Sequence, residues 1–383
     1  MFKCSPLTGP LCDATVTQTS YYRDDTYTMF HHHATVSGLT PHTKCFYKVG
    51  SKANPKFTSD VYLFVTARAA ADNSTFSMVV YGDFGPGDQS RNTIAYVNSW
   101  SSDKVDLIYH IGDVGYADDD FLMPGQATGF YYEKVSLPYL VLVGNHEAEC
   151  HSPACQVSPT KARALGNYTA YNARFKMPSR ETGGDLNMWY SFEPDPIHFT
   201  SISAETDYPG APPNKITLFT HNGNFGNQLA WPEADLKKAA ANRAKVPWII
   251  VAMHRPIYDS SNANNGVPVE QAAHIQAAFE ALFIKYKVDV VLTAHEHCYQ
   301  RLTPIRNNQP VLDGVSSDRK TYNNPKLLFK FCPWNVFSNY VDYGVSTLEA
   351  NRSMLSWKFV STANQAVLDQ FVLRKNASLG SAH

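Results

Sequence analysis

The chain has 383 residues, of which 44% are hydrophobic, and its formal net charge is −1. This composition indicates a folded globular protein that is long enough for two domains. The near-neutral charge argues against a nucleic-acid binder or a membrane-surface protein, because both carry a basic excess. No apolar run approaches the roughly 18 residues that a membrane span needs.

The first part of the chain, residues 1–70, is predicted to be a small β-domain. Short runs of strand-forming residues alternate there with turn residues. These runs cover residues 14–18, 31–36, 45–49 and 64–66. Small polar residues at 69–74 are typical of a linker. We therefore expect a second domain to occupy residues 71–383.

From residue 75 onward, strands are predicted to alternate with helices, which is typical of an α/β domain. Five short apolar runs resemble strands that are buried on both faces. They cover residues 76–81, 107–111, 139–143, 248–252 and 288–293. Helices are predicted over residues 233–244, which follow Pro232, and over residues 269–286. In the second helix Ile275, Phe279 and Phe283 share one face.

Each of the five predicted strands leads directly into a short polar motif. The motifs are GDFG from residue 82, GDVGY from 112, GNHE from 144, MHR from 253 and AHEH from 294. Ligands of open α/β sheets bind beyond the carboxyl ends of the strands. Five polar motifs at strand ends are therefore expected to converge on one site.

The residue types in these motifs predict a site for two metal ions. Asp, Asn, His and Tyr offer oxygen and nitrogen ligands that suit iron, zinc or manganese. A shared carboxylate can bridge two cations, and cations about 3.5–4 Å apart can clamp an in-line displacement at phosphorus. One of the ions would activate a hydroxide nucleophile. A single Gly-Asp turn or a single core histidine such as His254 would have an ordinary structural explanation, but an ordered set of five motifs argues against coincidence.

The ordered motifs resemble those of the metallophosphoesterases, and most closely those of the purple acid phosphatases. The pattern of that family is GDxG, GDxxY, GNH(D/E), VxxH and GHxH, in this order. Tyr116 is the discriminating residue, because calcineurin-type phosphatases lack this tyrosine. The resemblance covers most of the chain. It implies a four-layer α/β/β/α metallophosphoesterase domain after a small all-β, fibronectin-III-like sandwich, and an acid phosphatase that hydrolyses phosphate monoesters.

The resemblance also implies roles for individual residues. The expected ligands of a ferric ion are Asp83, Asp113, Tyr116 and His297. The expected ligands of a divalent ion, which would be zinc, iron or manganese, are Asp113, Asn145, His254 and His295. Asp113 would bridge the two ions and is thereby also essential to catalysis. His146 would assist the leaving group. Asn145, His146 and His254 would bind the substrate.

Several features leave alternatives open. A phytase-like or phosphodiesterase specificity could use the same site. A metal-binding protein with impaired catalysis is the other alternative, because the chain is shorter than the family pattern in two places. These places are the start of the β-domain and residues 326–333, and both predict reduced stability. Some family members have substrate-binding histidines after the fourth motif, but residues 259–266 contain none.

Other polar residues have simpler interpretations. His31, His32 and His33 cannot all face one ion, because neighbouring strand residues point to opposite faces, so packing is expected. Arg255 and Arg301 could attract phosphate, but ion pairing is the favoured role.

The cysteines and the glycosylation tripeptides bear on localisation. Cys150 and Cys155 could form a disulfide or remain reduced, and the odd total of seven cysteines leaves at least one unpaired within the chain. Glycosylation tripeptides start at Asn73, Asn167, Asn351 and Asn376. They favour a secreted glycoprotein, as the resemblance does, although the first residues lack a signal peptide's apolar stretch. The expected partner is a small phosphate ester, without nucleic acid or membrane, and the chain could form a homodimer.

Overall fold

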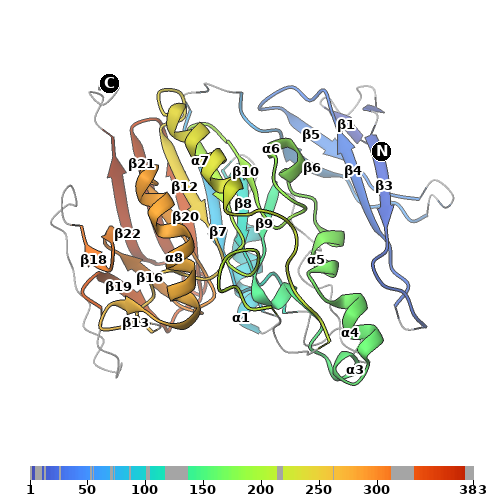
Figure 1. Ribbon diagram of the computed structural model, residues 1–383. Helices are drawn as coiled ribbons and strands as arrows, with labels where there is room; N and C mark the ends of the chain where they lie inside the picture. Colours follow the sequence, from blue (N-terminus) through green and yellow to red (C-terminus); the bar gives the residue numbers. More distant parts are fainter. Residues whose placement is uncertain are drawn as a thin grey trace.

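The computed structural model describes residues 2–4, 11–12, 14–25, 27–51, 54, 56–69, 72, 74–85, 88–100, 104–116, 137–213, 219–261, 263–311 and 332–375. Within these ranges a small β-domain lies beside a larger α/β domain (Figure 1). Most of the segment 326–333, whose length was noted above, lies outside the described residues. Among the helices that are described, none has both the length and the apolar character needed to cross a membrane.

The β-domain contains two small antiparallel sheets. One sheet has the strand order β2–β1–β5–β6 and the other is the hairpin β3–β4. The strands are Phe2–Cys4 (β1), Leu11–Cys12 (β2), Ala14–Thr19 (β3), His31–Val36 (β4), Lys44–Tyr47 (β5) and Tyr62–Val65 (β6). The four strands predicted for this region correspond to β3, β4, β5 and β6; the ends of β4 are as predicted, and those of the other three are shifted.

The α/β domain is built on two sheets. The six-stranded sheet has the order β22–β21–β20–β7–β8–β9, and the four-stranded sheet has the order β10–β11–β12–β15. The first comprises Phe76–Tyr81 (β7), Leu107–Ile111 (β8), Tyr139–Leu142 (β9), Gly344–Ala350 (β20), Met354–Ser361 (β21) and Val367–Arg374 (β22). The second comprises Tyr190–Phe192 (β10), Ile197–Ser201 (β11), Trp248–Ala252 (β12) and Val290–Leu292 (β15). The strands that precede the five motifs run parallel to one another within each sheet, whereas β7 is antiparallel to its other neighbour, β20.

Alternation along the buried strands builds the core between the two sheets. Met78 of β7, Tyr109 of β8 and Ile250 of β12 point into one apolar cluster shared by both sheets. The adjacent residues of β7 and β12, Val79 and Ile249, point away from that cluster into others. Successive side chains of a strand face opposite ways, so a continuous apolar run supplies both faces of a sheet.

Helices cover the outer faces of both sheets, which completes four layers. Ala230–Ala241 (α7) and Glu270–Lys285 (α8) pack on β12 through a cluster that contains Leu236, Ile275 and Phe279. Asp88–Asn98 (α1) packs through Val97 on the outer face of the six-stranded sheet. This arrangement confirms the predicted fold class. Pro232 lies inside the first turn of α7 rather than before it, where its missing N–H would have no partner within the helix.

Short elements connect the sheets and surround the site. Those after β9 are Asn145–Glu147 (η1), Pro153–Gln156 (α3), Pro159–Leu165 (α4), Thr169–Arg174 (α5) and Ser179–Thr182 (α6). The remaining strands are Ala263–Asn264 (β13), Val267–Pro268 (β14), Tyr299–Leu302 (β16), Ile305–Arg306 (β17), Gln309–Pro310 (β18) and Asn335–Asn339 (β19).

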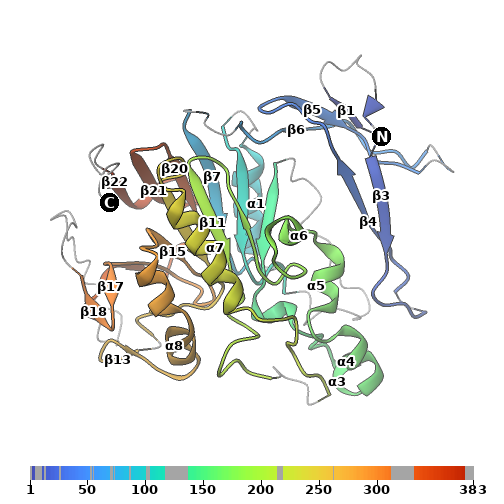
Figure 2. The ribbon, with the colours of Figure 1, turned by 45° about the horizontal axis from the view of Figure 1, so that its top comes forward.

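The β3–β4 hairpin docks on α4 and α5 of the α/β domain, beside which it lies in both views (Figures 1 and 2). Nε2 of His33 lies 2.9 Å from the carbonyl oxygen of Ala173, and Arg174 donates to the Tyr21 hydroxyl at 2.8 Å. The ring of His31 stacks on Tyr21, whereas His32 is exposed. The predicted packing role is confirmed for His31 and His33 but not for His32.

Candidate metal centre

The five polar motifs follow strands of both sheets. The motifs that contain Asp83, Asp113 and Asn145 follow β7, β8 and β9. Those that contain His254 and His295 follow β12 and β15. The backbone N–H of His295 donates to Asp83 Oδ2 at 2.8 Å, which ties the end of one sheet to the end of the other. The site is therefore shared by two facing sheets rather than set at the edge of a single open sheet.

The backbone at the site is unusual. Asp83, Asp113, Tyr116 and His295 all have positive φ values, of 55°, 50°, 49° and 74°. Residues other than glycine rarely adopt this backbone conformation, and it persists where the surrounding structure enforces it. A Cβ atom at Gly112 would collide with His254, and one at Gly144 would collide with Asp113. The glycines of the second and third motifs therefore allow close approach between the loops.

Asp113 lies at the centre of the site and is only 1% exposed. Its Oδ1 accepts the backbone N–H of His146 at 2.9 Å, and its Oδ2 lies 3.1 Å from Nε2 of His254. Burial raises the pKa of Asp113, but the neighbouring His254 and His146 outweigh burial and hold it well below the ordinary value. Asp113 is thus available as a carboxylate at acid pH.

His254 is oriented by a backbone carbonyl. Its Nδ1 lies 3.0 Å from the oxygen of Ile111, which can only accept, so Nδ1 carries the hydrogen and Nε2 faces Asp113. Burial lowers the pKa of His254, but the carboxylates of Asp113 and Asp83 outweigh it and raise the pKa to about 10. A proton and a metal ion therefore compete for Nε2.

Asp83, Tyr116 and His297 form a second group of donors. The Tyr116 hydroxyl donates to Asp83 Oδ1 at 3.2 Å and lies 2.7 Å from Nε2 of His297. Burial and the carboxylates of Asp83 and Asp113 raise the pKa of Tyr116 far above its ordinary value. The phenol would ionise only beside a strongly acidic cation.

Two observations indicate that the candidate ligands can hold a metal ion. Ligand atoms of Asp113, His254 and His295 all lie within 4.8 Å of one another. The buried Oδ1 of Asn145 has no hydrogen-bond partner among the described residues. Buried polar atoms are normally satisfied, so an orphaned amide oxygen beside this cluster fits a ligand role. The mixed oxygen and nitrogen donors suit iron, zinc or manganese.

Both arginines singled out from the sequence form ion pairs. Arg301 contacts Asp369 at 2.7 Å, and Nε of Arg255 lies 2.9 Å from the buried Glu205. Nη1 of Arg255 also lies 2.8 Å from Nε2 of His295. Burial and the Arg255 guanidinium lower the pKa of His295 to about 4, so this candidate ligand stays neutral in mild acid.

Glu147 is an important residue to which the sequence analysis assigned no role. Its carboxylate accepts the backbone N–H groups of Asp113 at 2.9 Å, Val114 at 2.8 Å and Gly144 at 2.8 Å. Burial and Asp113 raise its pKa to about 8. Glu147 ties the loop after β8 to the loop after β9, and the only sequence signal was its place in the third motif.

His146 lies against the same group of donors. Its ring centroid is 4.2 Å from that of Tyr116, and its backbone is held by Asp113. Direct contacts therefore connect seven of the eight candidate site residues: Asp83, Asp113, Tyr116, His146, His254, His295 and His297. The eighth, Asn145, precedes His146 in the chain.

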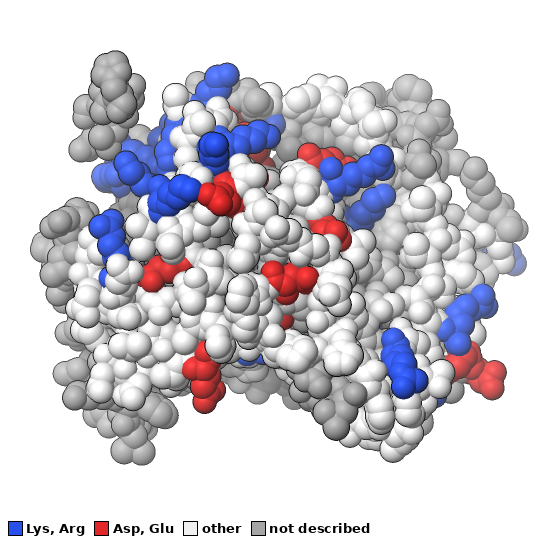
Figure 3. Space-filling view, viewed as in Figure 1, with Lys and Arg blue, Asp and Glu red and all other residues white. Residues whose placement is uncertain are grey.

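Basic side chains gather at the other end of the strands. Figure 3 shows Lys and Arg clustered above the end of α7, where Arg243 and Lys375 both pair with Asp289. Lys245 comes just before β12, whereas His254 follows the opposite end of that strand. This basic surface is therefore separate from the metal centre.

Comparison with protein families covers most of the chain. Residues 76–299 match the calcineurin-like phosphoesterases. Residues 9–66 match the N-terminal domain of purple acid phosphatases, and residues 319–370 match the iron/zinc purple acid phosphatase-like protein C.

Individual relatives agree with the family matches. An acid phosphatase of Aspergillus ficuum is 28% identical over 90% of this chain and 76% of its own length. Human acid phosphatase type 7 is 32% identical, over 78% of this chain and 62% of its own length. The structure of a purple acid phosphatase from yellow lupin seeds superposes with a TM-score of 0.70 at 20% identity, over 98% of this chain and 69% of that one. The superposition on the lupin enzyme shows that the two chains share a fold.

Proposed function

Because this chain belongs to the purple acid phosphatases, within the calcineurin-like phosphoesterases, we propose which of its residues carry the reaction. The chain is an acid phosphatase that hydrolyses phosphate monoesters at a dinuclear metal site. The identity of the metals and the role of each residue are the proposal.

Two overlapping sets of ligands form the proposed site. The ferric ion is held by Asp83, Asp113, Tyr116 and His297. The divalent ion, which is zinc, iron or manganese, is held by Asp113, Asn145, His254 and His295. The observation that carries this assignment is the convergence of Asp113, His254 and His295 within 4.8 Å, beside the orphaned amide oxygen of Asn145.

When bound, the two cations supply Lewis acidity to the phosphoryl group and an activated hydroxide. The chain's own residues orient the ester and handle its leaving group. Asn145 and His254 border the space that the phosphate would occupy. The imidazole of His146 donates a proton to the departing oxygen, a role that typically contributes 10²–10⁴-fold to the rate.

The test uses purified protein loaded with iron and with zinc or manganese. We expect two metal ions per chain and hydrolysis of p-nitrophenyl phosphate at acid pH. His146→Ala should lower kcat about 100-fold while keeping both metals. Bis(p-nitrophenyl) phosphate and phytate, assayed in parallel, distinguish diesterase and phytase-like specificities. Full metal loading without hydrolysis of any ester would instead identify a catalytically impaired metal-binding protein.

We propose further that the protein is secreted and glycosylated. The disulfide between Cys150 and Cys155 supports an oxidising compartment. Of the two glycosylation asparagines that the structure describes, Asn167 is the weaker acceptor, because its Nδ2 donates to the carbonyl of Gly223, whereas the Asn351 side chain accepts hydrogen bonds through its oxygen. Peptide mapping after glycosidase treatment should find Asn351 modified before Asn167.

A further inference from the structure

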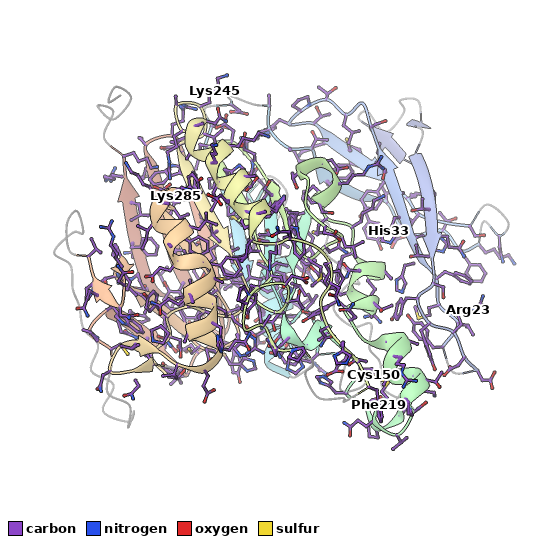
Figure 4. All side chains as sticks on the ribbon, viewed as in Figure 1. Arg23, His33, Cys150, Phe219, Lys245 and Lys285 are labelled. Atoms are coloured by element: carbon purple, nitrogen blue, oxygen red, sulfur yellow. A yellow bond between two sulfur atoms is a disulfide. The ribbon has the colours of Figure 1, made fainter. Side chains whose placement is uncertain are left out.

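A disulfide closes a short loop directly behind the third metal motif. Cys150 and Cys155 are bonded, and both side chains are buried. Tyr27 of the β-domain and Leu165 of α4 pack against this disulfide. Figure 4 labels Cys150 beside α3 and α4. The loop is therefore closed covalently and supported from behind by both domains.

His151 is the second residue of this loop, and its imidazole faces His146. The two ring centroids are 5.9 Å apart, with the planes inclined at 64°. The side-chain amide of Gln156 donates to the backbone carbonyl of His151. This hydrogen bond fixes the backbone of the loop at His151. His151 is thus positioned independently of the metal ligands.

A buried carboxylate lies on another side of the His151 ring. Oε1 of Glu149 lies 3.8 Å from Nε2 of His151, and the side chain of Glu149 is fully buried. The other oxygen of Glu149 accepts the hydroxyl of Thr220 at 2.6 Å. At this distance the two groups are in contact without a hydrogen bond, so the fixed carboxylate limits where the ring can lie. Thr220, Glu149, His151 and His146 therefore form a connected series that leads to the leaving-group side of the site.

We propose that His151 is a positioning residue that holds the His146 imidazole in line with the departing oxygen. The inference rests on the role proposed above for His146. Tyr116 at 4.2 Å and His151 at 5.9 Å are aromatic neighbours of the His146 ring.

The proposal predicts an effect that depends on the leaving group. A good leaving group such as p-nitrophenolate departs with little protonation, whereas phenolate needs a proton from a well-placed acid. A purely structural role for His151 would lower the rates for both esters by the same factor. A positioning role lowers the rate for phenyl phosphate more.

The experiment compares kcat for phenyl phosphate and p-nitrophenyl phosphate in His151→Ala, His151→Gln and the metal-loaded wild type. We expect His151→Ala to lose about 10-fold on phenyl phosphate and about 2-fold on p-nitrophenyl phosphate. His151→Gln, which keeps a hydrogen-bond donor, should recover part of the loss. Metal content and visible absorption should not change. His32→Ala, an exposed histidine of β4, is the matched control and should leave both rates unchanged.

A second variant tests whether His151 acts through His146. Once His146→Ala is present, adding His151→Ala should not change the ratio of the two rates further. Should His151→Ala fail to fold, Glu149→Gln and His151→Gln provide the same comparison. An unchanged ratio in every folded variant would overturn the proposal while leaving the acid phosphatase activity intact. A fully loaded wild type that hydrolyses neither ester would overturn both.

Discussion

Among single residues, Asp113 is the one shared by both proposed ion sites. Its two carboxylate oxygens contact the His146 backbone and the His254 ring, and the residue is almost fully buried. We expect Asp113→Ala to abolish hydrolysis and to release metal from both positions, since no other side chain of the set can take its place. Elemental analysis checks this, with the exposed Asp60→Ala as control. An active variant with two metals per chain would refute the bridging role.

The assignment of Tyr116 as a ferric ligand predicts that the protein is coloured. Its phenol ionises only beside a strongly acidic cation, because burial and two carboxylates raise its pKa. If a ferric ion is bound there, the protein should absorb visible light, and Tyr116→Phe should remove that absorption. The ring of the variant can still pack against His146, so the far-ultraviolet circular dichroism should be unchanged. A colourless, active, iron-free protein would contradict the ferric assignment.

At the level of secondary-structure elements, a buried polar network joins β10 and β11 to α7. Asp235 of α7 accepts the hydroxyls of Ser191 at 2.8 Å and Thr200 at 2.7 Å, and it lies 2.9 Å from Nε2 of His198. Burial lowers the pKa of His198, but Asp235 and Glu193 outweigh it and raise the pKa to about 9. The network is therefore most stable when His198 is charged.

This network predicts how stability depends on pH. A raised folded-state pKa adds stability that is complete below the unfolded value of about 6.5 and is lost as pH rises through about 9. The free energy of unfolding should therefore fall by up to about 3 kcal/mol between pH 6 and pH 10. Urea unfolding across this range measures the effect. His198→Gln should be less stable at pH 6 and should lose most of the pH dependence. An unaltered slope in this variant would assign the pH dependence to other groups.

Across the whole molecule, the β-domain supports the loop that carries Asn145 and His146. Tyr27 packs on the Cys150–Cys155 disulfide, and Lys161 of α4 pairs with Asp24 at 3.3 Å. The docking surface therefore reaches the loop that starts at the third motif. Contacts of this kind transmit order from one domain to a loop of the other.

Removing the Tyr27 side chain tests whether the β-domain stabilises the loop that carries Asn145 and His146. Tyr27→Ala should lower the free energy of unfolding by about 3 kcal/mol, because a buried aromatic ring is lost. It should also speed amide hydrogen exchange in residues 145–155. Tyr62→Ala is the matched control, because Tyr62 stacks on Tyr47 inside the β-domain. Equal exchange of this loop in both variants would show that the docking does not order it.

The buried strands and the candidate ligands were predictable from the amino-acid sequence, because both are local features of the chain. Apolar runs at 76–81, 107–111 and 248–252 became β7, β8 and β12 with the predicted ends, since a strand buried on both faces needs a continuous run. Each candidate ligand stands a few residues beyond such a run, so its place at a strand end follows from chain order.

Which sheets face each other, and what holds the ligands in place, could not be predicted, because both depend on contacts between distant parts of the chain. The Tyr109 ring of one sheet packs edge-on against Phe192 and Phe199 of the other, and no local pattern specifies that pairing. Glu147 and Glu205 act on partners 34 and 50 residues away, so their roles were invisible in the sequence. A buried carboxylate is stable only where distant donors meet it, and the packing of the two sheets creates those meeting points.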